Sequence, residues 1–330
     1  MQAFAVHGGR LHSAMRAWPN APKPWIDLST GINPFAYPAP RASAAARRRL
    51  PDPVEIAELE AAAARAFGVA DPARVLATAG AEAAIGLLPR LLPAGPALNP
   101  AVFIRTPTYG GHAAAWIAAG RPLSDDAEAA AVHVTVNPNN PDGRYETPAA
   151  LARRADALAA RGGWLVVDES FIESTGSPGV AALAHPRILA LRSFGKFYGL
   201  PGLRLGFLVG EPAMIAHARA LQGDWPVSAD AIAAGLKAYA DTAWAERTRA
   251  HLADAAHRMD AALEASGFRV LGRTRLFRLA EADNAADRFA ALCAQGILIR
   301  PFADHPRWLR FGLPPAAARN RVAAALRSLA

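Results

Sequence analysis

The segment SFGKFYGLPGLRLGF, residues 193–207, contains the side chains best suited to chemistry in this sequence. Lys196 lies between two phenylalanines, and an apolar setting near another cation keeps a lysine partly neutral, as Schiff-base chemistry requires. Ser193 and Arg204 add a hydroxyl and a guanidinium, which are groups that bind phosphate. This spacing predicts a nucleophilic lysine beside a phosphate-bearing cofactor. The alternative, a surface lysine in a loop, is disfavoured in a chain with only three lysines.

Two polar residues follow apolar runs that are typical of buried strands. Asp168 closes the run WLVVD, where a bare carboxylate is costly unless a cation pairs with it. A protonated pyridine nitrogen would be such a cation and would keep the ring an electron sink, although many strand-end aspartates only cap a following helix. Asn140 lies in the turn NPNNPDG, which would either direct its side chain inward or form an ordinary β-turn.

Two further turns present groups suited to a flat, anionic ligand. In TAGAEAAI a strand, a turn at Gly80 and a helix beginning near Ala81 and Glu82 would offer free N–H groups and a positive dipole end to an anion. Most glycine turns of this kind are purely structural. In TPTYGGH the ring of Tyr109 could lie against a flat cofactor.

The elements that position these residues alternate between strands and helices, which predicts an α/β fold with a mostly parallel, doubly wound sheet and a smaller α+β domain. We expect an irregular arm over residues 1–50 with little helix, a large domain over 51–212 and a small domain over 213–330. Residues 53–67 have helical periodicity and end at a glycine suited to a C-cap.

The composition limits the classes of protein to consider. The net charge of +8 comes from arginines spread along the chain, so we expect no nucleic-acid partner. Cys293 is the only cysteine, which excludes an internal disulfide and a cysteine-based metal cluster; we expect no metal. We see neither the apolar core of a signal peptide nor a run of about 18 apolar residues, and therefore expect a cytoplasmic protein without membrane association.

Taken together and in this order, these motifs resemble those of fold type I pyridoxal-phosphate enzymes, the aspartate-aminotransferase superfamily, over nearly the whole chain. The resemblance implies that Lys196 carries the cofactor covalently, Asp168 pairs with its pyridine nitrogen, Asn140 bonds its phenolic oxygen and Tyr109 stacks on its ring. It also implies a phosphate site, made up of Gly80, Ala81, Glu82, Ser193 and Arg204.

The sequence departs from the superfamily pattern at two positions. Many relatives have a tyrosine that touches the phenolic oxygen where this chain has Phe171. Many also have a tyrosine before P-D-P that reaches the phosphate of the neighbouring subunit, and here Leu50 stands in its place. That contact is therefore in doubt, whereas the homodimer that the resemblance implies is not.

The opening motifs narrow the resemblance to one branch. AVHGGRLHSA followed by WIDLSTGINPFAYP, with phenylalanine in DESF, is similar to cobalamin-pathway threonine-phosphate decarboxylases. The implied substrate has a carboxylate and a phosphate, so its site needs several cationic or hydrogen-bonding groups. The residues expected to form it are His7, Ser29, Asn33, Asn140, Arg300 and Arg310.

The implied reaction is decarboxylation of O-phospho-L-threonine to (R)-1-amino-2-propanol phosphate. In it the Cα–carboxylate bond is held perpendicular to the pyridine plane, and Lys196 is a candidate proton donor to Cα. The nearest alternative is an aminotransferase acting on histidinol phosphate or an aromatic amino acid, which would use the same fold and arginines. A binding or regulatory protein that has lost catalysis is a third possibility, which the intact lysine, aspartate, serine and arginine set disfavours.

Overall fold

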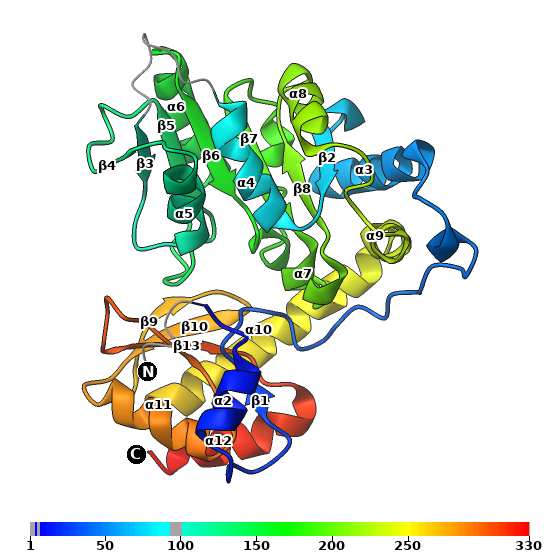
Figure 1. Ribbon diagram of the computed structural model, residues 1–330. Helices are drawn as coiled ribbons and strands as arrows, with labels where there is room; N and C mark the ends of the chain where they lie inside the picture. The colour runs from blue at the N-terminus through cyan, green and yellow to red at the C-terminus, as the bar shows by residue number, and fades with distance from the viewer. Residues whose placement is uncertain (1–3, 5–6, 93–100, 330) are drawn as a thin grey trace. The chain divides into compact units, whose positions relative to one another are not determined.

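The computed structural model describes residues 4, 7–92 and 101–329 of the chain. They divide into two compact units, each described here by itself (Figure 1). Unit 1 comprises residues 1–35, 141–144 and 247–330, and unit 2 comprises residues 36–140 and 145–246. The domain boundaries expected at residues 50 and 212 stay a prediction. Unit 2 extends beyond residue 212, to residue 246, because helix α9 packs on helix α3.

Unit 2 is built on a seven-stranded sheet with the order β2-β8-β7-β6-β5-β3-β4. Strand β8 is antiparallel to both of its neighbours, and the other pairs are parallel, which confirms the mostly parallel sheet. The strands are β2 (Val75–Thr78), β3 (Val102–Ile104), β4 (Leu123–Ser124), β5 (Val132–Val136), β6 (Trp164–Asp168), β7 (Ile188–Ser193) and β8 (Gly206–Val209).

Helices pack on this sheet, and one face forms a core with side chains of α4, α5 and α8, including Trp116. The helices of the unit are α3 (Pro53–Phe67), α4 (Ala81–Leu91), α5 (Gly110–Ala118), α6 (Pro148–Ala159), α7 (Phe194–Phe197), α8 (Pro212–Gln222) and α9 (Ala229–Ala240). Its 3-10 helices are η1 (Ala46–Arg48), η2 (Pro72–Arg74), η3 (Ile172–Ser174), η4 (Ala181–Leu183) and η5 (Pro201–Leu203).

Helix α3 shows how the local sequence determines where a helix begins and ends. Asp52 caps its first turn and forms a capping box with Glu55, which satisfies N–H groups that the helix itself leaves free. Gly68 ends the helix in the left-handed conformation at φ 72°. The helix predicted for residues 53–67 is therefore confirmed at both ends.

Unit 1 contains a four-stranded antiparallel sheet, β12-β13-β10-β9, and a separate parallel pair, β1 with β11. Its strands are β1 (Ile26–Asp27), β9 (Arg269–Arg273), β10 (Phe277–Glu281), β11 (Ile297–Leu298), β12 (Arg300–Pro301) and β13 (Trp308–Gly312). Its helices are α2 (Leu11–Ala17), most of α10 (Thr242–Ala265), α11 (Ala285–Ala294), α12 (Arg319–Arg327) and the 3-10 helix η6 (Ala316–Ala318).

In the described part of the arm, helix α2 is an element that the Pro- and Gly-rich composition does not predict. Helix α2 has seven residues, and Ala14 is its one buried member. Trp18, which follows it, contacts Phe4 and Phe289 at ring-centroid distances of 5.8 and 6.0 Å. Tertiary packing of the apolar residues around α2, and not its intrinsic propensity, accounts for the helix. No described helix is long and apolar enough to cross a membrane.

Candidate active site

Asp168 lies at the carboxyl end of β6, where it is buried. His112 Nε2 lies 3.0 Å from one of its carboxylate oxygens, and Ser170 donates to the other from its N–H at 2.9 Å and its hydroxyl at 2.5 Å. Burial raises the pKa of Asp168, but the hydrogen bonds and charge of His112 and the bonds from Ser170 together outweigh it and leave that pKa below its usual value. The site therefore holds a charged carboxylate.

His112 contacts Asp168 and is a residue of this site that the sequence motifs did not single out. It is fully buried in the first turn of α5, three residues after Tyr109. Its Nδ1 has no hydrogen-bond partner among the described residues, so Asp168 is the one side chain that these residues offer to the ring nitrogens. The available signal was the histidine at the end of TPTYGGH, one helical turn beyond Tyr109 on the same face.

Lys196 lies in α7, the one-turn helix that begins directly after β7. Its Nζ lies 5.7 Å from the centroid of the Phe171 ring. Strands β6 and β7 are adjacent and parallel, with Asp168 opposite Leu191, so both residues belong to the same edge of the sheet. The predicted apolar setting of the lysine is thus present, and Phe171 supplies part of it.

The predicted phosphate residues come together at the amino end of α4. Gly80 has φ 83°, and a Cβ there would lie 2.7 Å from Nη2 of Arg204. A Cβ at Gly206 would clash with the N–H of Ala81, and Gly206 is the β8 partner of Ser193. Backbone of β8, the start of α4 and the Arg204 guanidinium thus approach too closely for a larger residue at Gly80 or Gly206, and the first N–H groups of α4 lie next to that guanidinium.

Arg204 itself has an exposed side chain and a left-handed backbone at φ 53°. A non-glycine residue in this region costs roughly 1–3 kcal/mol and is found most often at functional sites. The carboxylate of Glu82 accepts a hydrogen bond from the Tyr109 hydroxyl at 2.9 Å, and the role of Glu82 at the phosphate stays a prediction. The Glu82 side chain therefore holds Tyr109, and the N–H groups of the α4 turn remain suited to an anion.

The turn that carries Asn140 is tied to the segment that carries Tyr109. Asn139 donates to the carbonyl of Pro107 at 2.9 Å and accepts from the Thr108 hydroxyl at 2.7 Å. Asn140 follows directly and is buried. The structure thus brings the two predicted motifs together, through an asparagine that the sequence analysis did not single out.

The residues predicted for substrate in unit 1 include two cross-strand arginines. Arg300 in β12 and Arg310 in β13 are Cα partners, so their side chains leave the same face of the sheet. Their guanidiniums lie 5.3 Å from the ring of Phe302 and 5.1 Å from the ring of Phe277. Burial, followed by repulsion from Arg300, lowers the pKa of Arg310 to about 9, against the opposing charge of Asp27.

The opening motifs of the chain lie side by side. The N–H of Gly9 donates to the Ser29 hydroxyl at 2.7 Å, and a Cβ at Gly8 would lie 2.8 Å from the Ser29 carbonyl carbon. The carbonyl of Ser29 in turn accepts from Arg310 at 2.7 Å. The H-G-G arm with exposed His7 therefore packs on Ser29, and only glycine permits that approach.

Asn33 has a local role in the structure. It is buried, and its side-chain oxygen accepts from the N–H of Phe35 at 2.8 Å, which closes a turn. The arginines, Ser29, His7 and Asn33 all belong to unit 1, whereas the lysine, aspartate and phosphate residues belong to unit 2.

Comparison with known proteins gives similarity over nearly the full length. The chain is 39% identical to threonine-phosphate decarboxylase from a Sinorhizobium species, covering 97% of each sequence. It is 38% identical to the protein of the same name from Pseudomonas aeruginosa, covering 97% of this chain and 96% of that one. Histidinol-phosphate aminotransferase from an Anaeromyxobacter species is 31% identical over 58% of this chain and 54% of its own.

Solved structures share the fold. Histidinol-phosphate aminotransferase from Sinorhizobium meliloti, determined in complex with pyridoxal-5'-phosphate, superposes with a TM-score of 0.80 at 22% identity, covering 97% of this chain and 94% of that one. The family model described as aminotransferase class I and II matches residues 23–128 and 121–329. The chain therefore belongs to the aminotransferase class I and II family.

Proposed function

We propose that this protein is a pyridoxal-phosphate-dependent decarboxylase that acts on O-phospho-L-threonine, as the resemblance to the cobalamin-pathway enzymes implies. The observation that carries the proposal is the set at the sheet edge of unit 2: Lys196 after β7, charged Asp168 at the end of β6, and the cradle at Gly80. The choice of reaction is supported by two relatives of that name that match 97% of the chain at 39% and 38% identity. A histidinol-phosphate aminotransferase matches 58% of the chain at 31% identity, and an aromatic amino acid aminotransferase matches 87% at 32%.

The residues present fit the proposed cofactor. A phosphate suits the amino end of α4 at Gly80 and Ala81, which lies next to the Arg204 guanidinium and to Gly206, the strand partner of Ser193. Asp168, kept ionised by His112 and Ser170, would pair with a protonated pyridine nitrogen. Bound there, the cofactor would supply an electron sink for the pair released when the carboxylate leaves.

The arginines of unit 1 suit a substrate with two anionic groups. Arg300 and Arg310 project from adjacent strands, and the depressed pKa of Arg310 shows that its positive charge is costly where it lies. A bound anion offsets that cost through bidentate, charge-assisted hydrogen bonds. We propose that these two residues receive the carboxylate and phosphate of the substrate.

The chain's own groups would then act on a substrate held in one orientation. The Cα–carboxylate bond breaks, carbon dioxide leaves, and Cα takes up one proton in its place. We propose Lys196 Nζ as the donor of that proton, because it is the amine at the sheet edge that also carries Asp168. Phe171, packed near the amine, would limit the access of water.

The test begins with an absorbance spectrum of the purified protein after reconstitution with pyridoxal phosphate. We expect a band of the lysine-bound cofactor, followed by catalytic release of carbon dioxide when O-phospho-L-threonine is added without a keto acid. Lys196→Ala is expected to lack the band, and Lys237→Ala, a change at an exposed lysine of α9, is expected to retain it.

Two results would contradict the proposal in different ways. A persistent band in Lys196→Ala would mean that another group holds the cofactor. Conversion of the wild-type cofactor to its amine form by histidinol phosphate, without release of carbon dioxide from phosphothreonine, would make the protein an aminotransferase.

We also propose that the protein is a cytoplasmic homodimer, as the family resemblance implies. Two large apolar side chains at the start of α3 support a partner on that surface: Leu50 is 61% exposed and Val54 is 64% exposed. Contiguous exposed apolar surface is typical of interaction sites.

A further inference from the structure

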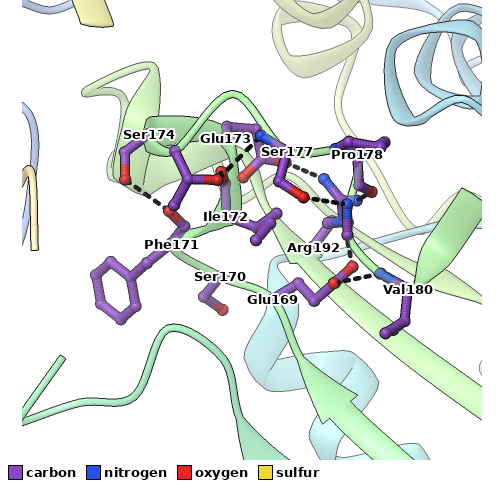
Figure 2. Close-up of polar contacts among 12 residues, drawn as sticks. Glu169, Ser170, Phe171, Ile172, Glu173, Ser174, Ser177, Pro178, Val180 and Arg192 are labelled. Carbon is purple, nitrogen blue, oxygen red and sulfur yellow. Dashed lines mark hydrogen bonds and ion pairs between the residues drawn. The ribbon is translucent and has the colours of Figure 1, made fainter. Parts of the chain in front are cut away.

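Three charged side chains form a buried cluster at the carboxyl ends of β6 and β7. Arg192 donates from Nε to Glu169 at 3.1 Å and from Nη1 to Glu173 at 3.2 Å, and its Nη2 donates to the carbonyl of Pro178 (Figure 2). All three charged residues are buried. We call Arg192, Glu169 and Glu173 the Arg192 cluster. Nothing in the proposed reaction uses it.

Its strands are the ones that carry the proposed catalytic residues. Glu169 directly follows Asp168, and Arg192 directly precedes Ser193. Successive residues of a strand point to opposite faces of a sheet. At the ends of β6 and β7, Asp168 and Ser193 therefore lie on one face of the sheet and the Arg192 cluster on the other. The cluster fixes the two strands to each other at that point.

The cluster also holds the segment that follows Asp168. A carboxylate oxygen of Glu169 accepts from the N–H of Val180 at 2.7 Å, and Gly179, at φ 69°, lies so near that a Cβ would be 2.6 Å from the carboxylate carbon. Figure 2 shows this segment folded around Arg192, with the ring of Phe171 directed away from it. That ring is the one that Lys196 Nζ approaches to 5.7 Å.

Aromatic rings connect the cluster to the helix of Lys196. The guanidinium of Arg192 lies 4.6 Å from the ring centroid of Phe67, which contacts Tyr239 at 5.4 Å. Tyr239 contacts Phe194, the first residue of α7, at 5.6 Å. Contacts thus lead from the cluster to the first residue of α7, and Phe171 lies in the sequence between the two glutamates of the cluster.

We propose that Arg192, acting through Glu169 and Glu173, is a positioning residue that holds Phe171 and helix α7 so that Lys196 and Asp168 keep their places at the cofactor. The proposal rests on the function assigned above to Lys196. A buried ion cluster is a poor way to gain stability alone, since apolar residues of similar volume often do as well. The cluster is better explained by a need to fix the geometry next to the reacting lysine.

The test compares Arg192→Met, Arg192→Lys and a control, Arg121→Met. Arg121 is also a buried arginine of unit 2 that lies near an aromatic ring. It follows the carboxyl end of α5, whereas His112 lies in the first turn of that helix. For each protein we would measure the melting temperature, the dissociation constant of pyridoxal phosphate, and the pH midpoint at which the band of the lysine-bound cofactor titrates.

For Arg192→Met we expect binding of pyridoxal phosphate to weaken about 10-fold or more and the titration midpoint to rise by about one pH unit. The midpoint rises because loss of Phe171 packing admits water, which favours the protonated form of the lysine-bound group. Arg192→Lys, which keeps the charge but not the planar fork, is expected to restore part of both values. Arg121→Met is expected to lower the melting temperature only.

The proposal is wrong if Arg192→Met and Arg121→Met lower the melting temperature alike and leave the other two measurements at their wild-type values. If Arg192→Met does not fold, Glu173→Gln is the substitute, with a smaller rise of the midpoint expected and an unchanged midpoint contradicting the proposal. Failure of the function itself is separate, because it would appear as a wild-type protein without the band.

Discussion

At the residue scale the central feature is a carboxylate whose environment decides its charge. Asp168 is buried, and burial alone would favour its neutral form, yet His112 and Ser170 hold its pKa below the usual value. A neutral carboxyl could not keep a pyridine nitrogen protonated. The histidine is therefore as necessary to the proposed chemistry as the aspartate it contacts.

Removal of that histidine gives the first prediction. In His112→Phe the pKa of Asp168 rises, so the carboxylate loses its charge at a higher pH as the solution is acidified. We expect the acid limb of the pH–rate profile to move to higher pH and the maximal rate to fall by roughly 10-fold or more, since a hydrogen bond to a charged group contributes about 1.5–3 kcal/mol.

The matched control for that change is His133→Phe. His133 is a buried histidine of β5 whose Nε2 contacts the backbone carbonyl of Ala127 at 2.7 Å. The variant His133→Phe is expected to leave the acid limb of the pH–rate profile at its wild-type position. An acid limb that stays fixed in His112→Phe would show that Asp168 does not depend on the histidine.

Arg310 gives a prediction of pH dependence. Its pKa is lowered to about 9, so its positive charge is present below that pH and is lost as the pH rises through it. We expect the affinity for 3-phosphonopropionate, which has both anionic groups but no amine, to fall above pH about 9. Calorimetric titration between pH 7 and 10 would measure this, and a dissociation constant that is level over the range would contradict the assignment.

At the scale of elements, the proposed phosphate site depends on the close approach of β8 to the first turn of α4. No side chain can intervene at Gly206, because a Cβ would lie 2.6 Å from the carbonyl carbon of Gly80 and closer still to the N–H of Ala81. The strand and the helix meet through backbone alone, which leaves N–H groups available to an anion.

Substitution of that glycine tests the site. Gly206→Ala would push the start of α4 away, and overpacking of this kind costs about 1–3 kcal/mol. We expect pyridoxal phosphate to bind at least about 5-fold more weakly, as measured by absorbance titration. Gly202→Ala, in the same segment but with no atom within 4 Å of the added Cβ, is expected to bind as the wild type does. Equal binding by both variants would place the phosphate elsewhere.

At the scale of the whole molecule, the exposed Leu50 and Val54 bear on assembly. We expect the wild type to be a dimer at micromolar concentration by light scattering, and the double variant Leu50→Glu, Val54→Glu to be largely monomeric, because it would bury like charges across the interface. Leu183→Glu, at another exposed leucine of unit 2, is the control. A monomeric wild type would remove the dimer from the proposal.

The sequence by itself determined the elements and the kinds of residue that meet at the sheet edge. Local rules suffice for these: the capping box at Asp52 and the left-handed Gly68 define α3, and the apolar run before Asp168 defines β6. Parallel strands bring their carboxyl ends to one edge, so Asp168, Ser193 and Lys196 were predictable as one group before any coordinates.

Only the tertiary structure decided which partners those residues have. The contact of His112 with Asp168, of Arg192 with Glu169 and Glu173, and of Asn139 with Thr108 all join separate segments, and neither periodicity nor spacing records such pairs. Helix α2 likewise depends on packing that its own composition does not show. The physical reason is the same throughout: propensity acts between neighbours in the sequence, whereas burial and charge act between neighbours in space.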